Sequence, residues 1–417
     1  MALSSTRSKW PRRFFSALGP GLVTGAADDD PSGIATYSIA GAQLGTSLLW
    51  TALLTWPLMA AVQMMCARIG MVRGEGLAAA LRKRIPKPFV IVATFSLLLA
   101  NTINIAADLA GMADAAEMLT GLNSHVYVLV FGIGIAVAIV RLPYHRIASI
   151  LKWLALALFA YVITAFRVGV DWREVAQSAF VPSWPQSKEA WATLVAILGT
   201  TISPYLFYWQ ASQEVEEEKT LGETTRASRR GATRREIADR TLDVGVGTFF
   251  SNLVMFFIIL TTAVTLHRHG ITKIETSRQA AEALRPLAGE FAATLFTVGV
   301  LGVGFLAIPT LAGSAAYAFA ETFGWRQGLD QKVAGARRFY FIVGVSTAAG
   351  IALDFAKISP LKALYWSAIV NGLLAPFLLV ASSRKLMEKQ PSSVLGRVAV
   401  GVATLLMFGA AIGMFVF

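Results

Sequence analysis

The sequence predicts an all-α protein that crosses a membrane many times, and three observations support this fold class. The 417 residues are 55% hydrophobic and only 15% charged, whereas a soluble protein carries roughly 25% charged residues. The apolar residues gather in long blocks rather than at helical or strand spacing. Most blocks have about the length at which a helix crosses the roughly 30 Å hydrocarbon core of a bilayer.

Eleven such blocks fill the chain. In order, they cover about 16–39, 46–67, 88–118, 125–142, 148–168, 189–212, 242–265, 288–319, 338–356, 361–382 and 394–416. No stretch between them is long enough to form a second folded domain, so the sequence predicts one transmembrane domain over residues 1–417. The longest connection, 214–240, is acidic first and basic later. This pattern is typical of a solvated loop with a surface helix near 232–240.

The Lys and Arg residues are unevenly divided between the two sides of the membrane. If the N-terminus is inside, 28 of the 37 lie in inner segments and 9 in outer segments. The positive-inside rule then predicts a cytoplasmic N-terminus and, after eleven spans, an external C-terminus, in a plasma membrane of the bacterial inner-membrane type. The same distribution explains the net charge of +12 without a nucleic-acid partner.

Two of the expected spans are interrupted in the same manner. The first breaks at Asp30-Pro31-Ser32-Gly33 and the sixth at Ser203-Pro204-Tyr205. The two prolines lie 173 residues apart, which is also five spans apart. Because five is odd, the second half would enter the membrane with opposite topology. Paired breaks of this kind indicate a transporter built from inverted repeats, spans 1–5 and 6–10, with an eleventh helix, and place its site at the breaks.

Three consecutive aspartates, Asp28, Asp29 and Asp30, come directly before the proline of the first break, Pro31. A carboxylate near the bilayer centre is costly unless it has a partner, and unwound backbone survives there only where it lines an enclosed or watery cavity. No Lys or Arg lies near the middle of any predicted span, so we expect the partner to be a cation from solution. Asp30, at the break, is the preferred ligand. For Asp28 and Asp29, a position facing an aqueous vestibule is an equal alternative.

The stretch GPGLVTGAADDDPSGIAT, with AGAQLGTSLLW after it, resembles the first two helices of the NRAMP divalent-metal transporters. Their hallmark in helix six falls on 203–205, and AADLAG (106–111) and Arg337-Arg338 agree further. The resemblance covers about 18–383. It implies a LeuT-like fold with alternating access, a divalent metal ion as substrate, and no resident cofactor. We expect a monomer in the lipid bilayer.

The departures from the NRAMP hallmarks concern the ion-binding positions. Asp30-Pro31 matches Asp-Pro-Gly-Asn, but Gly33 stands where the family has its coordinating asparagine. In the Met-Pro-His hallmark, Ser203 replaces the metal-binding methionine and Tyr205 replaces the histidine. A soft thioether favours transition metals, so its loss removes the main discrimination against Mg²⁺ and Ca²⁺.

Four further positions complete the comparison. Thr200 falls where a small residue contributes its backbone carbonyl, and Asp108 keeps the acidic position of helix three. Gly111 replaces the glutamate associated with proton movement. Asn371, in the tenth span, either faces the site or packs in the core. The residues and the resemblance together give the expected metal-site residues Asp30, Ser203, Thr200, Gly33, Tyr205, Asp29, Asp108 and Asn371.

A roomy site of oxygen ligands suits Mg²⁺, which keeps several waters and is bound by one or two carboxylates. The pattern resembles the NRAMP-related magnesium transporters, so we expect Mg²⁺ import without proton coupling, with Mn²⁺ as a further substrate. The first alternative is a proton-coupled Mn²⁺/Fe²⁺ transporter. The second is a sodium-coupled carrier of organic solutes, against which the three aspartates argue. No nucleophile–base pair indicates an enzyme.

Overall fold

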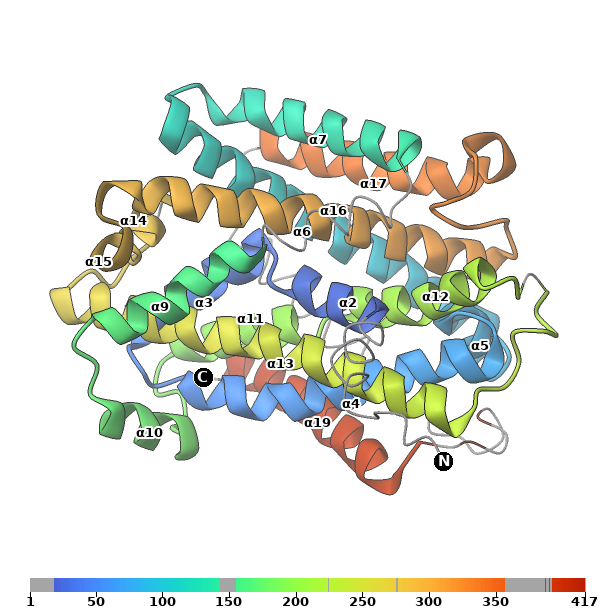
Figure 1. The fold of residues 1–417 in the computed structure, drawn as a ribbon, viewed down its shortest axis with the longest axis horizontal. Coiled ribbons are helices and arrows are strands. Elements are labelled where there is room, and N and C mark those ends of the chain that lie inside the picture. The colour runs from blue at the N-terminus through green and yellow to red at the C-terminus, as the bar shows by residue number, and fades with distance from the viewer. Residues whose placement is uncertain are drawn as a thin grey trace, which may run out of the picture.

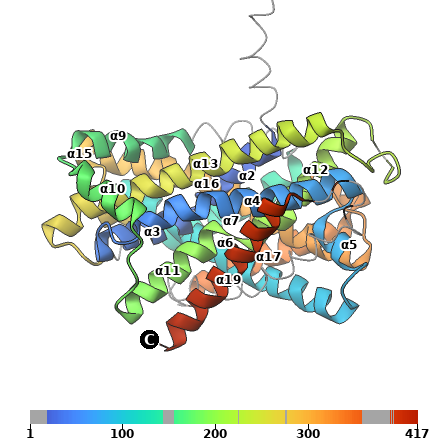
Figure 2. The same ribbon diagram turned by 90° about the horizontal axis from the view of Figure 1, so that it is seen from below.

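The computed structural model describes residues 19–142, 155–223, 225–274, 277–356 and 392–416, together with Met387 and Gln390. The regular structure in these ranges is helical throughout. The long helices run alongside one another in a bundle (Figures 1 and 2). The predicted tenth span, with Asn371, lies outside the described residues.

The helices follow the order of the predicted spans. Their bounds are α2 (Pro20–Asp28), α3 (Pro31–Leu44), α4 (Leu49–Arg73), α5 (Leu77–Leu81), α6 (Lys87–Thr120), α7 (Ser124–Arg141), α9 (Phe159–Arg167), α10 (Trp172–Phe180), α11 (Lys188–Thr201), α12 (Pro204–Thr220), α13 (Arg234–Thr265), α14 (Ser277–Glu282), α15 (Arg285–Ala288), α16 (Ala292–Phe323), α17 (Arg337–Phe355) and α19 (Val394–Val416). Within the described ranges, seven helical segments are long and apolar enough to cross a membrane. The prediction of an all-helical, multi-span protein is confirmed.

The first break is encoded locally. Asp29 leaves the helical conformation after α2, Asp30 is extended, and Pro31 is the first residue of α3. Proline suits this position because its missing N–H would have no partner in the first turn. The Asp30 carboxylate accepts a hydrogen bond of 2.6 Å from the Gly33 N–H, so it caps α3 in the usual manner of an N-cap aspartate.

The second break is built differently. Ile202 ends α11, Ser203 is extended, and Pro204 begins α12. The Ser203 hydroxyl does not cap α12. It donates instead to the carbonyl oxygens of Gly199 at 2.7 Å and Thr200 at 2.6 Å, which lie in the last turn of α11. These carbonyls would otherwise lack partners at a helix end.

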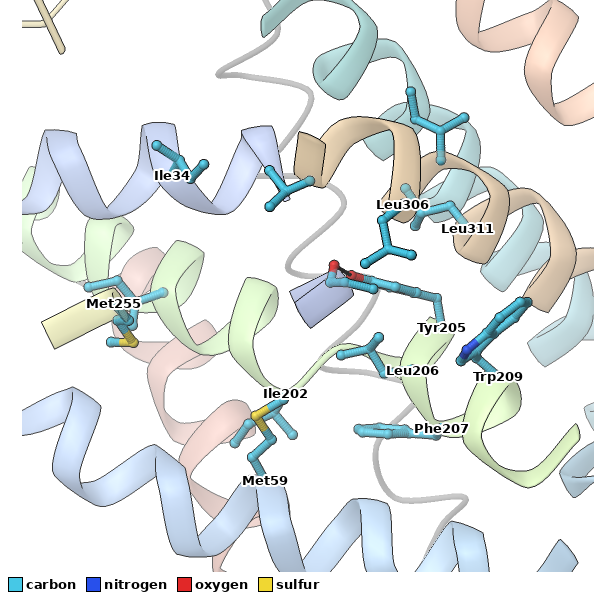
Figure 3. Close-up of a cluster of buried hydrophobic side chains, with 14 of the residues drawn as sticks. Ile34, Met59, Ile202, Tyr205, Leu206, Phe207, Trp209, Met255, Leu306 and Leu311 are labelled. Atoms are coloured by element: carbon cyan, nitrogen blue, oxygen red, sulfur yellow. Dashed lines mark hydrogen bonds between the residues drawn. The ribbon is translucent and has the colours of Figure 1, made fainter. Parts of the chain in front are cut away.

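The two breaks lie against each other. The Tyr205 hydroxyl, in the first turn of α12, donates to the Ala27 carbonyl of α2 at 3.1 Å. The hydroxyls of Tyr37 on α3 and Thr201 on α11 are 3.3 Å apart. Around this junction the side chains are otherwise mostly apolar, and Figure 3 shows Tyr205 among large buried hydrophobic residues. Polar groups near the breaks therefore stand out from their surroundings.

For 214–240, the predicted helix near 232–240 is confirmed, but the predicted loop is wrong for the first part of the stretch, and Arg240 is buried rather than solvated. Helix α12 continues to Thr220 and α13 begins at Arg234. Glu214 and Arg240 are buried, and Arg240 Nε lies 2.8 Å from Glu214 Oε2. The two charges satisfy each other inside the protein, and a scan for apolar residues does not detect such a pair.

We call the end of the bundle at the start of α2 the inner end, after the side that the sequence predicts for it. It lies at the right of Figure 1, with α5 and the end of α12, and α10, α14 and α15 lie toward the opposite, outer end. The short helices α2 and α12 thus form the inner halves of the two broken spans. Helices α3 and α11 form the outer halves.

Candidate functional site

All three aspartates of the first break are buried, with 1%, 4% and 3% of Asp28, Asp29 and Asp30 exposed. Asp28 Oδ2 accepts a hydrogen bond of 2.5 Å from the Ser251 hydroxyl on α13, and Asp29 Oδ1 lies 3.4 Å from the same hydroxyl. Asp28 Oδ1 has no hydrogen-bond partner among the described residues. A buried carboxylate oxygen without a partner carries a large desolvation penalty, which a bound cation would remove.

The two carboxylate oxygens of Asp30 have different contacts. Oδ1 accepts both the Gly33 N–H at 2.6 Å and the Ser32 hydroxyl at 2.7 Å. The cap therefore needs only one oxygen, and Oδ2 remains outside it. An ionised carboxylate has about four acceptor positions, so Asp30 can cap α3 and bind an ion at the same time.

Asp108 approaches the first break from α6. Its Oδ1 accepts the Ser32 N–H at 3.1 Å, while Oδ2 is buried and lacks a partner in the described part of the chain. Ser32 thus connects two carboxylates, since its hydroxyl donates to Asp30 and its N–H to Asp108. The sequence predictions did not include Ser32 in this role, although its place just after the proline was a usable signal.

Gly33 lies directly beside Asp30. A Cβ atom added at this position would be 3.2 Å from Asp30 Oδ1 and 3.4 Å from the Asp28 carbonyl oxygen. Any larger residue would press on the oxygens of the break. The glycine therefore keeps a side chain away from these oxygens.

The predicted residues of the second break contribute through their main chain and hydroxyls. The Thr200 hydroxyl donates to the carbonyls of its own helix at residues 196 and 197, and its carbonyl accepts from Ser203. Ser203 is fully buried with its proton committed to α11, so toward an ion it offers only oxygen lone pairs. Tyr205 holds its hydroxyl on the Ala27 carbonyl.

One buried side chain was missed entirely. Gln63, in the middle of α4, is fully buried, and neither polar atom of its amide has a partner among the described residues. Helix α4 packs against both α12 and α13. A glutamine inside an apolar span was a readable signal, because polar groups at that depth are rare and generally functional.

The arrangement limits the kind of ion site that can form. In the described ranges, no three His, Cys, Asp or Glu side chains are close enough together to hold a metal ion. An ion at the breaks would therefore use one or two carboxylates together with carbonyl, hydroxyl and water oxygens. Such a mixed oxygen shell is typical of hard cations.

The profile of the Nramp family, described as "Natural resistance-associated macrophage protein-like", matches residues 21–417. The chain belongs to the Nramp family. The divalent metal cation transporter MntH of Yersinia enterocolitica is 28% identical over 311 residues, covering 72% of this chain and 71% of its own length. The MntH of Erwinia tasmaniensis is 29% identical over 315 residues, with the same coverage. As a member of this transporter family, the chain is not an enzyme.

Solved structures show the same architecture. A manganese transporter from Eremococcus coleocola superimposes with a TM-score of 0.73 at 18% identity, covering 99% of this Nramp chain and 89% of that one. Mhp1, a nucleobase-cation-symport-1 family transporter in a closed conformation, gives 0.54 at 15% identity over 96% and 91%. At these identities the likeness concerns the fold alone. The LeuT-like fold is therefore confirmed, and so is the broader Nramp resemblance.

Proposed function

We propose that this Nramp chain transports divalent metal cations, with the ion held where the two helix breaks meet. The observation that carries the proposal is the set of buried carboxylates at that junction. Asp28 and Asp108 each keep one oxygen without a partner in the described structure, and Asp30 uses a single oxygen for its cap. The curated relatives are named divalent metal cation transporters, which supports this substrate class.

Alternating access would use the four half-helices as two pairs. Opening of the outer halves α3 and α11 would admit the ion, and opening of the inner halves α2 and α12 would release it. Each break frees backbone groups to accompany the carboxylates, as in other transporters with interrupted helices. Because the positive-inside rule places α2 on the cytoplasmic side, we propose import.

We propose Mg²⁺ as the main substrate. Ser203 and Tyr205 replace the methionine and histidine of the Nramp hallmark, so the candidate set contains neither thioether nor imidazole. Gly33 also supplies no side-chain ligand at the position of the hallmark asparagine, which leaves more of the coordination to water, as is usual for Mg²⁺. Both observations favour a harder ion than the transition metals.

Mn²⁺ is the second candidate, and the comparisons favour it over Mg²⁺. The solved structure with the TM-score of 0.73 is that of a manganese transporter. Proton coupling belongs to this alternative. Two observations argue against proton coupling. Tyr205 stands at the position of the hallmark histidine. Gly111 stands at the position of the glutamate associated with proton movement, and a Cβ added there would lie 3.2 Å from Pro31 Cβ. We propose that transport is driven by the ion gradient, with Asp108 as the remaining acidic group.

Flux measurements decide between the two. Purified protein in liposomes is given equal inward gradients of Mg²⁺ or Mn²⁺ while a trapped dye reports internal pH. We expect Mg²⁺ entry without acidification, in excess of protein-free liposomes. Selective Mn²⁺ entry against a large excess of Mg²⁺, with acidification locked to it, would establish the alternative. Absence of flux for both ions would refute divalent-cation transport.

A further inference from the structure

A second group of buried charges lies at the inner end of α2, away from the helix breaks. We call it the inner polar network, and its members are Thr24, Gln210, Glu214, Glu217, Arg240 and Asp243. The described contacts within the network join α2, α12 and α13. Helix α2 contacts both α13 and α12, and Figure 1 shows it beside them in the middle of the bundle.

The start of α2 is capped from another helix. Its own N-cap residue, Gly19, has no side chain that can accept the free N–H groups of the first turn. Asp243 of α13, which is completely buried, supplies the acceptor. Its Oδ1 accepts the N–H groups of Gly19 at 2.8 Å and Leu22 at 3.0 Å, and its Oδ2 accepts the N–H of Gly21 at 2.8 Å. A carboxylate also interacts favourably with the positive end of the helix dipole.

Asp243 is itself held in place by Arg240, one turn earlier on α13. Arg240 Nη1 donates to Asp243 Oδ2 at 2.7 Å, and Arg240 Nε lies 2.8 Å from Glu214 Oε2 on α12. The same guanidinium pairs through Nη2 with Glu217. One arginine thus connects the carboxylate that caps α2 with two carboxylates of α12.

The network also closes directly between α2 and α12. The Thr24 hydroxyl donates to Gln210 Oε1 at 2.7 Å, and Gln210 Nε2 donates to Glu214 Oε1 at 2.7 Å. The links from α2 around to α13 and back are therefore buried or half-buried hydrogen bonds, apart from the contact of Arg240 Nε with Glu214, which is an ion pair. Charge-assisted bonds of this kind are the stronger class.

Glycines bring the two backbones into contact beside the network. A Cβ on Gly25 of α2 would lie 2.3 Å from the carbonyl oxygen of Gly247 on α13, and a Cβ on Gly247 would lie 2.3 Å from the Gly21 oxygen. Helices α2 and α13 thus fit together without room for side chains. In this arrangement the inner half of the first broken span is closed onto α12 and α13.

We propose that Asp243 is a positioning residue that holds α2 in this closed arrangement, and that its three bonds to α2 must break for the inner side to open. This inference rests on the proposed transport function but concerns opening rather than the ion. Removal of the carboxylate would leave one buried and two half-buried N–H groups without this acceptor, a loss that favours exposure of the helix end to water. The structure then assigns Asp243 to the release step rather than to ion binding.

The test measures access to the helix break from the inner side. Ala27 is fully buried at the end of α2, and Cys66 is the chain's single cysteine. In protein carrying Cys66→Ala and Ala27→Cys, the thiol introduced at position 27 reports opening through its rate of reaction with a membrane-impermeant maleimide applied to the inner face of oriented proteoliposomes. Asp243→Ala is expected to raise this rate about tenfold or more, which corresponds to the loss of one bond to a charged group.

Matched variants make the result specific. Asp239→Ala removes another carboxylate of α13, 42% exposed and 3.9 Å from Arg235, and is expected to leave the rate unchanged. Asp243→Glu is expected to restore part of the slow rate. If Asp243→Ala does not fold, the alkylation rate of Asp243→Asn is used instead, since this substitution keeps the shape of the side chain and removes its charge.

An unchanged rate in a folded Asp243 variant would overturn the inference. The readout does not depend on ion flux, so failure of the proposed transport function leaves this test intact. Conversely, suppose that an Asp243 variant shows normal Mg²⁺ or Mn²⁺ flux and the alkylation rate of the parent protein. This result would exclude the proposed role of Asp243 and would leave the transport proposal intact.

Discussion

The two halves of the first broken span each begin at a buried carboxylate, but the carboxylates come from different places. The outer half, α3, is capped by Asp30, the residue just before it. The inner half, α2, is capped by Asp243, which lies 222 residues after Gly21 in the chain. One cap is a local feature and the other is a tertiary contact.

The difference between the caps also separates two uses of a buried carboxylate. Asp30 Oδ1 accepts two hydrogen bonds, the cap of α3 leaves Oδ2 outside it, and the Tyr205 hydroxyl also bonds to the carboxylate. Asp243 accepts four, with two on each oxygen. Burial is common to both residues. Burial alone therefore does not separate the candidate ion ligand from the structural group, whereas the full use of both Asp243 oxygens by the protein does.

The comparison of the two helix caps is tested most directly by variants of Asp30. Asp30→Ala is expected to reduce Mg²⁺ uptake about a hundredfold or more, since Mg²⁺ in proteins depends on one or two carboxylates. Asp30→Asn is the matched control, because asparagine caps helices as well as aspartate. It should melt close to the parent protein in detergent and still fail to transport. Normal uptake by Asp30→Asn would show that the residue serves only as a cap.

A steric pair of variants separates the two halves. Gly25→Ala, on α2, is expected to lower the free energy of unfolding by about 1–3 kcal/mol, because its Cβ must displace the α13 backbone. Gly33→Ala, on α3, meets its nearest neighbour at 3.2 Å and should melt within a few degrees of the parent. Thermal unfolding in one detergent measures both. Equal destabilisation would contradict the close fit described for the inner half.

The ligands opposite Asp30 should determine which ion it binds. Ser203→Met restores the thioether of the Nramp hallmark and is expected to raise the ratio of Mn²⁺ to Mg²⁺ uptake about tenfold, because sulfur favours the softer ion. Ser203→Leu matches its size without sulfur and should not change the ratio in this direction. A similar shift with leucine would mean that space, rather than ligand chemistry, sets the preference.

Asp28 tests whether a second carboxylate of the first break shares the ion. Its Oδ2 is held by Ser251 and its Oδ1 has no partner in the described chain. Asp28→Ala is expected to weaken the apparent affinity for Mg²⁺ about threefold to tenfold, in the range expected from one interaction with a charged group. Ser251→Ala should have a smaller effect. A loss as large as that of Asp30→Ala would make Asp28 an equal ligand.

Much of the fold could be predicted because its signals are local. The long apolar blocks correspond closely to the described spans, and Asp30-Pro31 and Ser203-Pro204 mark the breaks where they occur. The burial of charges in and beside the region 214–240 could not be predicted in this way. Glu214, Arg240 and Asp243 are charged residues beside a loop, and nothing along the chain distinguishes them from solvated ones.

The sequence by itself determined where the two interrupted spans break, because a proline at the first helical position and an aspartate three residues before a free N–H act within one turn. It also determined which atoms are present near the breaks, namely oxygen without thioether or imidazole. Only the tertiary structure decided which carboxylates are satisfied by the protein. Asp243 meets Arg240 and the start of α2, while Asp28 and Asp108 keep oxygens without partners in the described chain. The physical reason is that the partners of a buried charge come from helices far apart in sequence, and packing alone brings them together.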